Sequence, residues 1–149
     1  MEIKKMEEKK TMCIRATTAV QDLPQVLGQG YGEIMGVVQA QGLQPAGAPY
    51  TLYYNDDMSA LDIEFGFPVV ESGSEKGRVK PGVLPGGKTA AALHIGPYDT
   101  IGKTYEELTG FVKENGGDPK GICYEVYIDD PSTTKPEELN TEVVFLLND

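Results

Sequence analysis

An internal repeat constrains this chain more than any other feature of its sequence. When the sequence is shifted by 74 residues, 11 of the 29 positions in 28–56 carry the same residue as their counterparts in 102–130. Average composition predicts about two such matches. After a longer loop the register resumes at a shift of 78 residues, which places Glu64 over Glu142. The sequence therefore predicts two copies of one folding unit.

Each copy has the pattern of a strand, a helix and two further strands. The expected strands are 11–18, 49–55, 60–67, 88–95, 122–129 and 141–147, and the expected helices are 22–41 and 98–115. Each helix pattern stops at a glycine with a proline three residues later, Gly42 with Pro45 and Gly116 with Pro119, which is a typical end signal. The mixed charged residues of 2–10 are typical of a solvated strand face, and the sequence of 71–78 predicts an exposed loop.

These elements predict an α+β fold of duplicated strand–helix–strand–strand units. We expect an antiparallel sheet with two helices on one face and a ligand cleft at the pseudo-twofold axis. The whole chain, 1–149, is expected to form a single domain, with repeat halves of about 1–70 and 77–149.

Composition narrows the classes of partner. The net charge is -10, from 13 basic and 23 acidic residues, which argues against a nucleic-acid partner and mildly favours cationic ligands. No stretch approaches the roughly 20 apolar residues of a membrane span, and the N-terminus lacks the apolar core of a signal peptide, so we expect a cytoplasmic protein. Two cysteines and one histidine are too few for a Cys/His metal site, and we expect no metal and no cofactor.

Alternation along the strands assigns side chains to the two faces of the sheet. Tyr50, Leu52, Tyr124 and Val126 are expected on the helix-covered face with Ile63, Phe65, Val143 and Phe145. The opposite face then carries acidic and aromatic residues: Thr51, Tyr53, Glu64, Glu125, Tyr127 and Glu142. A carboxylate among aromatic rings requires a partner, either an organic cation or a proton. For Glu64 and Glu142 an open, merely solubilising face remains the alternative.

The sequence allows more than one role for two residues near the second helix, Tyr98 and His94. Tyr98 follows Gly96 and Pro97 at the strand-to-helix corner, where it either anchors packing or points its hydroxyl into the cleft. His94 is the single histidine, and no nucleophile motif accompanies it, so a hydrogen-bonded strand histidine is the favoured interpretation.

The order of several short motifs resembles the GyrI-like family of effector-binding domains. The resemblance rests on Gly96-Pro-Tyr98, the helix with Tyr105, Tyr124-Glu-Val-Tyr-Ile-Asp-Asp-Pro131, Pro136-Glu-Glu-Leu139 and Thr141-Glu142, and on Asp62-Ile-Glu-Phe-Gly-Phe-Pro68 in the first copy. In multidrug-sensing members a glutamate at the position of Glu125 lies at the pocket base and receives cationic ligands. Because no helix-turn-helix precedes the first strand, we expect a stand-alone member rather than a transcription factor.

The resemblance and the residues together leave three hypotheses. The first is a module that binds amphipathic, cationic or polarised small molecules through Thr51, Tyr53, Glu64, Glu125, Tyr127 and Glu142. The second is a hydrolase of strained cyclopropanoid compounds, as some free-standing members are, in which Glu125 activates water and a tyrosine (Tyr53, Tyr98 or Tyr127) donates a proton. The third is a protein-interaction module like the gyrase-inhibiting member. A protein partner or a homodimer remains open.

Overall fold

The computed structural model describes residues 1–149, and its elements follow the predicted order with two strands added. The helices are α1 (Leu23–Ala40) and α2 (Ile101–Glu114). The strands are β1 (Glu2–Met6), β2 (Lys9–Thr18), β3 (Tyr50–Tyr53), β4 (Leu61–Pro68), β5 (Lys80–Leu84), β6 (Gly87–Ile95), β7 (Pro119–Tyr127) and β8 (Asn140–Leu147). Short 3₁₀ turns at Val20–Asp22 and Tyr98–Thr100 lead into the helices, and a third lies at Pro136–Glu138.

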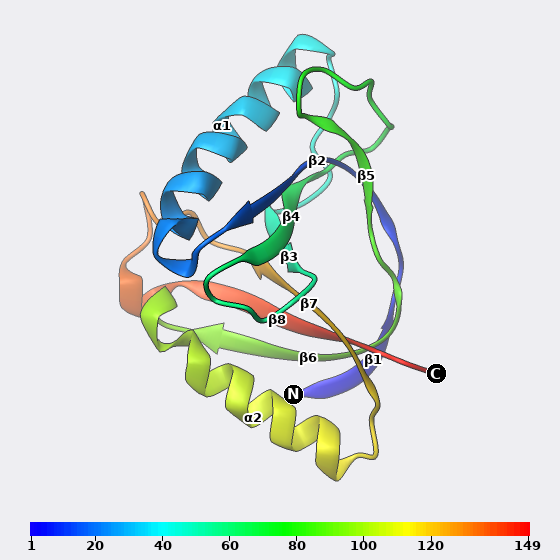
Figure 1. The fold of residues 1–149 in the computed structure, drawn as a ribbon, viewed down its shortest axis with the longest axis vertical. Helices are drawn as coiled ribbons and strands as arrows, with labels where there is room; N and C mark the ends of the chain where they lie inside the picture. Colours follow the sequence, from blue (N-terminus) through cyan, green and yellow to red (C-terminus); the bar gives the residue numbers. More distant parts are fainter. The chain divides into compact units, whose positions relative to one another are not determined.

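The chain forms two compact units, which do not coincide with the repeat halves 1–70 and 77–149. One unit comprises 8–85, and the other comprises 1–7 together with 86–149. The difference arises because β1 pairs with β6 instead of β2, and β5 pairs with β2 instead of β6 (Figure 1). The leading strand of each copy is thus exchanged into the sheet of the other copy. The pattern of a strand does not specify its partner, so the sequence did not reveal this exchange.

The unit of residues 8–85 packs α1 against an antiparallel sheet. Its strands lie in the order β3, β4, β2, β5. Ile34 and Val38 of α1 pack against Ile14, Ile63 and Phe65 of the sheet, all of them buried. Because apolar residues recur at helical spacing on α1 and at alternate positions on β2 and β4, the two elements bury one stripe and one face against each other.

The other unit repeats this arrangement. Its antiparallel strands lie in the order β1, β6, β8, β7, and α2 lies beside β6 (Figure 1). Leu108 and Val112 of α2 pack against Ala90 and Ala92 of β6 and Val143 of β8. Alanines along β6 allow the helix to approach this sheet closely, since their side chains are small.

Strand registers confirm the duplication. In one unit Tyr53 lies opposite Ile63 and Leu52 opposite Glu64. In the other unit Tyr127 lies opposite Thr141 and Val126 opposite Glu142. These pairs are related by the two shifts seen in the sequence, so the α+β fold with its repeated strand–helix–strand–strand unit agrees with the sequence prediction.

The predicted side-chain faces of β3 and β7 are wrong. Thr51 and Tyr53 lie opposite the core residues Phe65 and Ile63 and therefore face α1. Glu125 lies opposite the core residue Val143, so it faces α2 together with Tyr127. Glu64 and Glu142 remain on the opposite faces, as predicted.

The error has a physical reason. Tyr50, Leu52 and Tyr124 were assigned to the helix-covered core because they are large and apolar, and they are indeed almost fully buried. They are buried on the face away from the helices. A strand that is buried on both faces gives no alternation of apolar and polar residues, so its phase cannot be read from the sequence.

β5 was missed because its sequence argues against a strand. Pro81 and Gly82 lie within it, and both residues weaken a central strand. β5 is bonded to β2 on one side and lies at the end of the order β3, β4, β2, β5. An edge position tolerates the missing amide hydrogen of proline.

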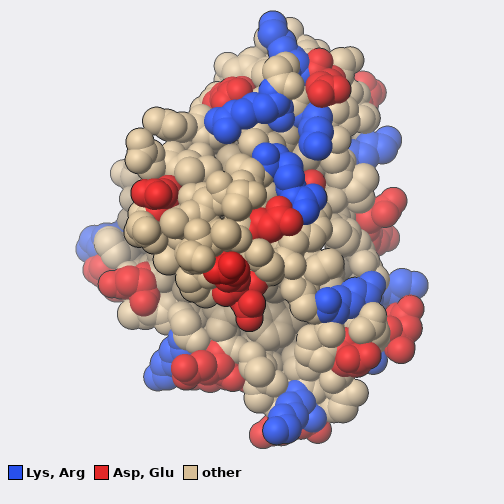
Figure 2. Space-filling view, viewed as in Figure 1, with Lys and Arg blue, Asp and Glu red and all other residues tan.

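Neither helix is long and apolar enough to cross a membrane. On the face drawn in Figure 2, acidic and basic side chains are interspersed among uncharged ones.

Two glycines of α1 provide a test of helix packing. A methyl group on Gly30 would lie 2.2 Å from Cε2 of Phe65, whereas one on Gly28 would meet nothing within 4 Å. Gly30→Ala should therefore destabilise the protein by about 1–3 kcal/mol through overpacking. Gly28→Ala should stabilise it by about 0.5–1 kcal/mol, since alanine favours helix. Urea denaturation of both variants measures this, and equal effects would contradict the packing of α1 on Phe65.

Candidate functional site

Glu125 is a buried carboxylic acid held between a helix and a strand. It lies in β7 on the side of α2, and the residue is only 8% exposed. Tyr105 of α2 donates its hydroxyl hydrogen bond to Glu125 Oε2. Tyr127, two residues further along β7, donates to Oε1 at 3.0 Å. Each carboxyl oxygen therefore accepts one phenolic hydrogen bond.

Burial raises the pKa of Glu125 above that of an ordinary glutamic acid. The hydrogen bonds from Tyr105 and Tyr127 lower that pKa, and so does the charge of His94, but burial dominates. Desolvation disfavours the charged form, whereas donors to a carboxylate favour it. A buried carboxyl group whose pKa is shifted in this way is a candidate functional group.

Tyr98 lies at the edge of this cluster. Its ring packs edge-on against that of Tyr127, with centroids 5.7 Å apart and planes at 72°. The side chain is half-exposed, and its pKa is raised by burial and by the carboxylates of Asp130 and Glu125. Both roles considered for Tyr98 are compatible with this position, since it packs on Tyr127 and lies near Glu125.

The corner that carries Tyr98 is fixed by His94. Its Nε2 lies 2.9 Å from the Pro97 carbonyl oxygen, and its Nδ1 lies 2.8 Å from Thr104 Oγ1. Because a carbonyl oxygen only accepts, Nε2 carries a hydrogen and donates it to Pro97, while Nδ1 is bonded to the Thr104 hydroxyl. Gly96 has a φ of +137°, a backbone conformation that glycine adopts readily and residues with a side chain rarely do. His94 is thus the hydrogen-bonded strand histidine that the sequence indicates.

Thr141 completes the polar cluster on this face. It lies in β8 directly opposite both His94 in β6 and Tyr127 in β7. The residue is fully buried, and its hydroxyl makes no hydrogen bond.

The other unit carries an equivalent arrangement around Thr51 and Tyr53. Tyr31 of α1, the counterpart of Tyr105, donates its hydroxyl to the Tyr50 carbonyl oxygen at 2.6 Å and lies 3.1 Å from Thr51 Oγ1. Thr51 occupies the position that Glu125 has in β7. A helix tyrosine therefore reaches the same strand position in both copies, and only one copy has a carboxyl group there.

The structure separates Glu64 and Glu142 from this arrangement. Glu142 lies on the face opposite α2, where Lys4 Nζ approaches its Oε2 to 3.3 Å. Glu64 lies on the face opposite α1, and its pKa is raised by burial. The prediction that Glu125 shares a face with Glu142 is therefore wrong, because the phase of β7 was misread.

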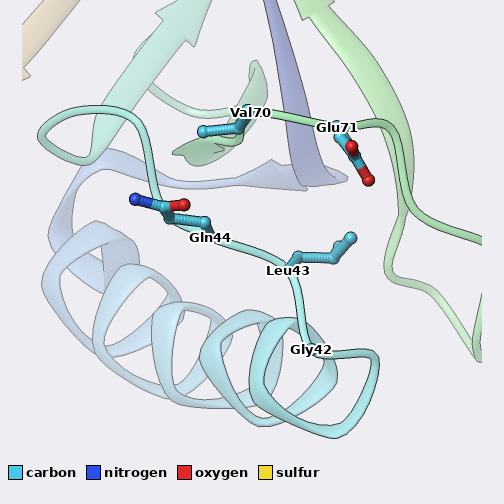
Figure 3. Close-up of a pocket in the computed structure, with 5 residues that line it drawn as sticks. All are labelled: Gly42, Leu43, Gln44, Val70 and Glu71. Carbon is cyan, nitrogen blue, oxygen red and sulfur yellow. The ribbon is translucent and has the colours of Figure 1, made fainter.

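A separate pocket of about 200 Å³ lies at the C-terminal end of α1 (Figure 3). Gly42, Leu43, Gln44, Val70 and Glu71 line it, and none of the predicted site residues takes part. The side chains of Leu43 and Glu71 point to one side of the loop, and those of Gln44 and Val70 point to the other. The wall is held by a backbone hydrogen bond of 3.0 Å from Val70 to Gln44.

Sequence reasoning missed Tyr105 and Thr141 as site residues. Tyr105 was visible as an identity of the repeat with Tyr31, but on an amphipathic helix such a tyrosine reads as core. Thr141 belongs to the Thr141-Glu142 motif of the resemblance, but nothing in the sequence marked it as a site residue, because threonine is common in strands and its missing hydrogen bond appears only in the structure.

The raised pKa of Glu125 predicts a pH-dependent stability. The folded state binds the proton more tightly than the unfolded chain, so this contribution is present below about pH 4.3 and is lost as pH rises through the folded pKa. Glu125→Gln carries no such proton, so the variant should gain stability relative to the wild type as pH rises. Each unit of raised pKa corresponds to about 1.4 kcal/mol.

Urea denaturation between pH 4 and pH 8 measures the effect. Glu107→Gln, at an exposed position of α2, is the control for loss of one charge. A stability difference between Glu125→Gln and the wild type that is independent of pH would contradict the burial of the carboxyl group.

Solved structures of known proteins share this fold. EcmrR in its DNA complex is 24% identical to this chain, with a TM-score of 0.87. The match covers 99% of this chain but only 56% of the EcmrR chain. The EcmrR C-terminal domain alone has a TM-score of 0.85 and 23% identity over 99% of this chain and 96% of its own. At these identities the likeness shows the fold.

Two more distant structures add to this group. A hydrolase from Listeria innocua has a TM-score of 0.70 at 13% identity, covering 99% of this chain and 91% of that one. SAV2435 bound to tetraphenylphosphonium has a TM-score of 0.64 at 13% identity, with coverages of 99% and 93%. No curated protein matches the sequence significantly. The sequence model described as the GyrI-like small molecule binding domain matches residues 1–147, so this chain belongs to the GyrI-like small-molecule-binding family.

Proposed function

We propose that this domain binds amphipathic small molecules with a cationic or polarised centre, which Glu125 receives. The observation that carries the proposal is the buried carboxyl group of Glu125, fixed by hydrogen bonds from Tyr105 and Tyr127. A buried carboxylate is costly without a counter-charge, and the phenols offset this cost only in part, as the raised pKa shows. An organic cation supplies the missing charge.

The aromatic surroundings suit the same class of ligand. Tyr98 and Tyr127 present ring surface beside the carboxyl group, and ring faces attract cations. Because Tyr98 is half-exposed, part of this surface is open to solvent. A ligand with an apolar body and a positive centre would thus contact both rings and the carboxylate.

The relatives support this proposal. EcmrR, whose structure was solved in a complex with DNA, contains a C-terminal domain of this fold, and SAV2435 binds tetraphenylphosphonium, a bulky organic cation. We extend this ligand class to the present domain on the strength of Glu125 and the adjoining rings.

Replacing Glu125 tests the role of its charge. Glu125→Gln should weaken binding of a naphthylmethyl trimethylammonium ion about tenfold or more, because a charge-assisted contact typically contributes about 1.5–3 kcal/mol. The neutral carbon analogue, with a tert-butyl group in place of trimethylammonium, should bind the variant and the wild type alike. Isothermal titration calorimetry measures both ligands.

Glu64→Gln is the matched control. It removes the same charge from a buried glutamate on the other face of a sheet, so cation binding should be nearly unchanged. Equal losses for the cationic and the neutral ligand in Glu125→Gln would show that Glu125 only shapes the site.

A second candidate function is hydrolysis of a strained cyclopropanoid compound. A carboxyl group with a raised pKa and neighbouring tyrosine hydroxyls provide a base and an acid. Glu125 would take a proton from water while the water oxygen bonds to a ring carbon. The breaking carbon–carbon bond would send its electron pair into a conjugated carbonyl, whose oxygen takes the proton of Tyr98. The Listeria innocua hydrolase of this fold favours retaining the candidate.

A pH–rate profile tests this candidate. The rate should fall as pH drops through the raised pKa of Glu125, because the base must be ionised. Glu125→Gln should abolish turnover, and Tyr98→Phe should slow it by about 10²–10⁴. Product identification by mass spectrometry provides the readout. Unchanged turnover in Glu125→Gln would refute the mechanism.

A further inference from the structure

The hydroxyl of Thr141 is buried and makes no hydrogen bond, although Thr141 is 0% exposed. Buried polar groups in folded proteins are almost always paired, because an unpaired one destabilises the folded state. Thr141 lies beside Glu125 on the face that α2 covers, since it is opposite Tyr127 and two residues along β8 from Val143, the partner of Glu125. Such diagonal neighbours have Cα atoms about 7–8 Å apart.

The residues around Thr141 use their polar atoms elsewhere. Both ring nitrogens of His94 are engaged, by Thr104 and by the Pro97 carbonyl oxygen. Tyr127 donates its hydroxyl hydrogen to Glu125. The hydroxyl of Thr141 therefore remains for another molecule.

The other copy shows that the fold does not require polarity here. By strand register, Ile63 is the counterpart of Thr141, and Ala16 and Thr51 are the counterparts of His94 and Glu125. An apolar side chain thus fills the equivalent position in the same architecture. A threonine hydroxyl that costs stability and is not needed by the fold indicates a binding role.

We infer that Thr141 is a second anchor for the ligand and selects protonated amines over quaternary cations. This inference rests on the proposed binding of cations at Glu125. A carboxylate offers about four acceptor positions, of which the two tyrosines take two. A primary ammonium has three N–H donors, two for the carboxylate and one for Thr141. A quaternary ammonium or phosphonium ion has none, so it leaves Thr141 unpaired.

On this inference, a ligand would reach Thr141 past Tyr98, the half-exposed residue at the edge of the cluster. Tyr98 is 38% exposed and contacts the ring of Tyr127 by an edge.

Calorimetric binding of two matched ions tests the inference. The probes are 1-naphthylmethylammonium and its N,N,N-trimethyl analogue, each with wild type, Thr141→Val and Thr141→Ser. The wild type should bind the primary ammonium about tenfold or more tightly than the trimethyl ion. Thr141→Val should lose most of this preference while its affinity for the trimethyl ion stays within about twofold, since valine keeps the shape. Thr141→Ser should retain the preference.

Thermal unfolding without ligand gives an independent readout. Thr141→Val should melt about 2–4 °C higher than the wild type, because an unpaired buried hydroxyl is removed. Thr89→Val is the control: Thr89 is equally buried but donates to the Lys4 carbonyl oxygen at 2.8 Å, so this variant should melt lower.

Each contrary result has a distinct meaning. If the wild type binds both ions equally, or Thr141→Val melts lower than the wild type, the role of Thr141 is refuted and cation binding at Glu125 stands. If the wild type binds neither ion, the proposed function fails, and the inference fails with it.

Discussion

The cost of burying the carboxyl group of Glu125 governs the structure around it. Tyr105 and Tyr127 each donate to one carboxyl oxygen, and they come from α2 and β7. The bond from Tyr105 ties α2 to β7 at one point, whereas the bond from Tyr127 lies within β7. Since the phenols do not fully replace lost hydration, the pKa of Glu125 stays raised. The buried carboxyl group therefore holds its proton more tightly than an exposed glutamic acid does.

Comparison of the two copies distinguishes residues that the fold requires, which occur in both, from residues that occur only at the candidate site. Tyr31 and Tyr105 occupy equivalent positions, and each reaches the strand beside its helix, at Thr51 in one copy and Glu125 in the other. A tyrosine hydroxyl can donate to a backbone carbonyl oxygen, as Tyr31 does, or to a carboxylate, as Tyr105 does, so the frame tolerates either residue. The carboxyl group, His94 and Thr141 occur in one copy, which makes that copy the candidate site.

The sequence predicted the architecture better than the site. The repeat and the Gly–Pro helix stops identified both helices and six of the strands, because these signals are local. The exchange of β1 and β5 depends on distant partners and left no trace in the pattern. The phase of β3 and β7 was misread since Tyr50 and Tyr124 are buried on the face away from the helices. Glu125 was identified as central, but its donor Tyr105 was not placed in the site.

Titration of the Glu125 side-chain carboxyl carbon by NMR, without ligand and with a saturating organic cation, tests the central claim most directly. Burial should give the free protein a Glu125 pKa above that of an ordinary glutamic acid. A cation bound against the carboxylate stabilises its charged form, so saturation should lower this pKa. A Glu125 pKa that does not change when the cation binds would contradict the account, because the ligand would then contact some other part of the protein.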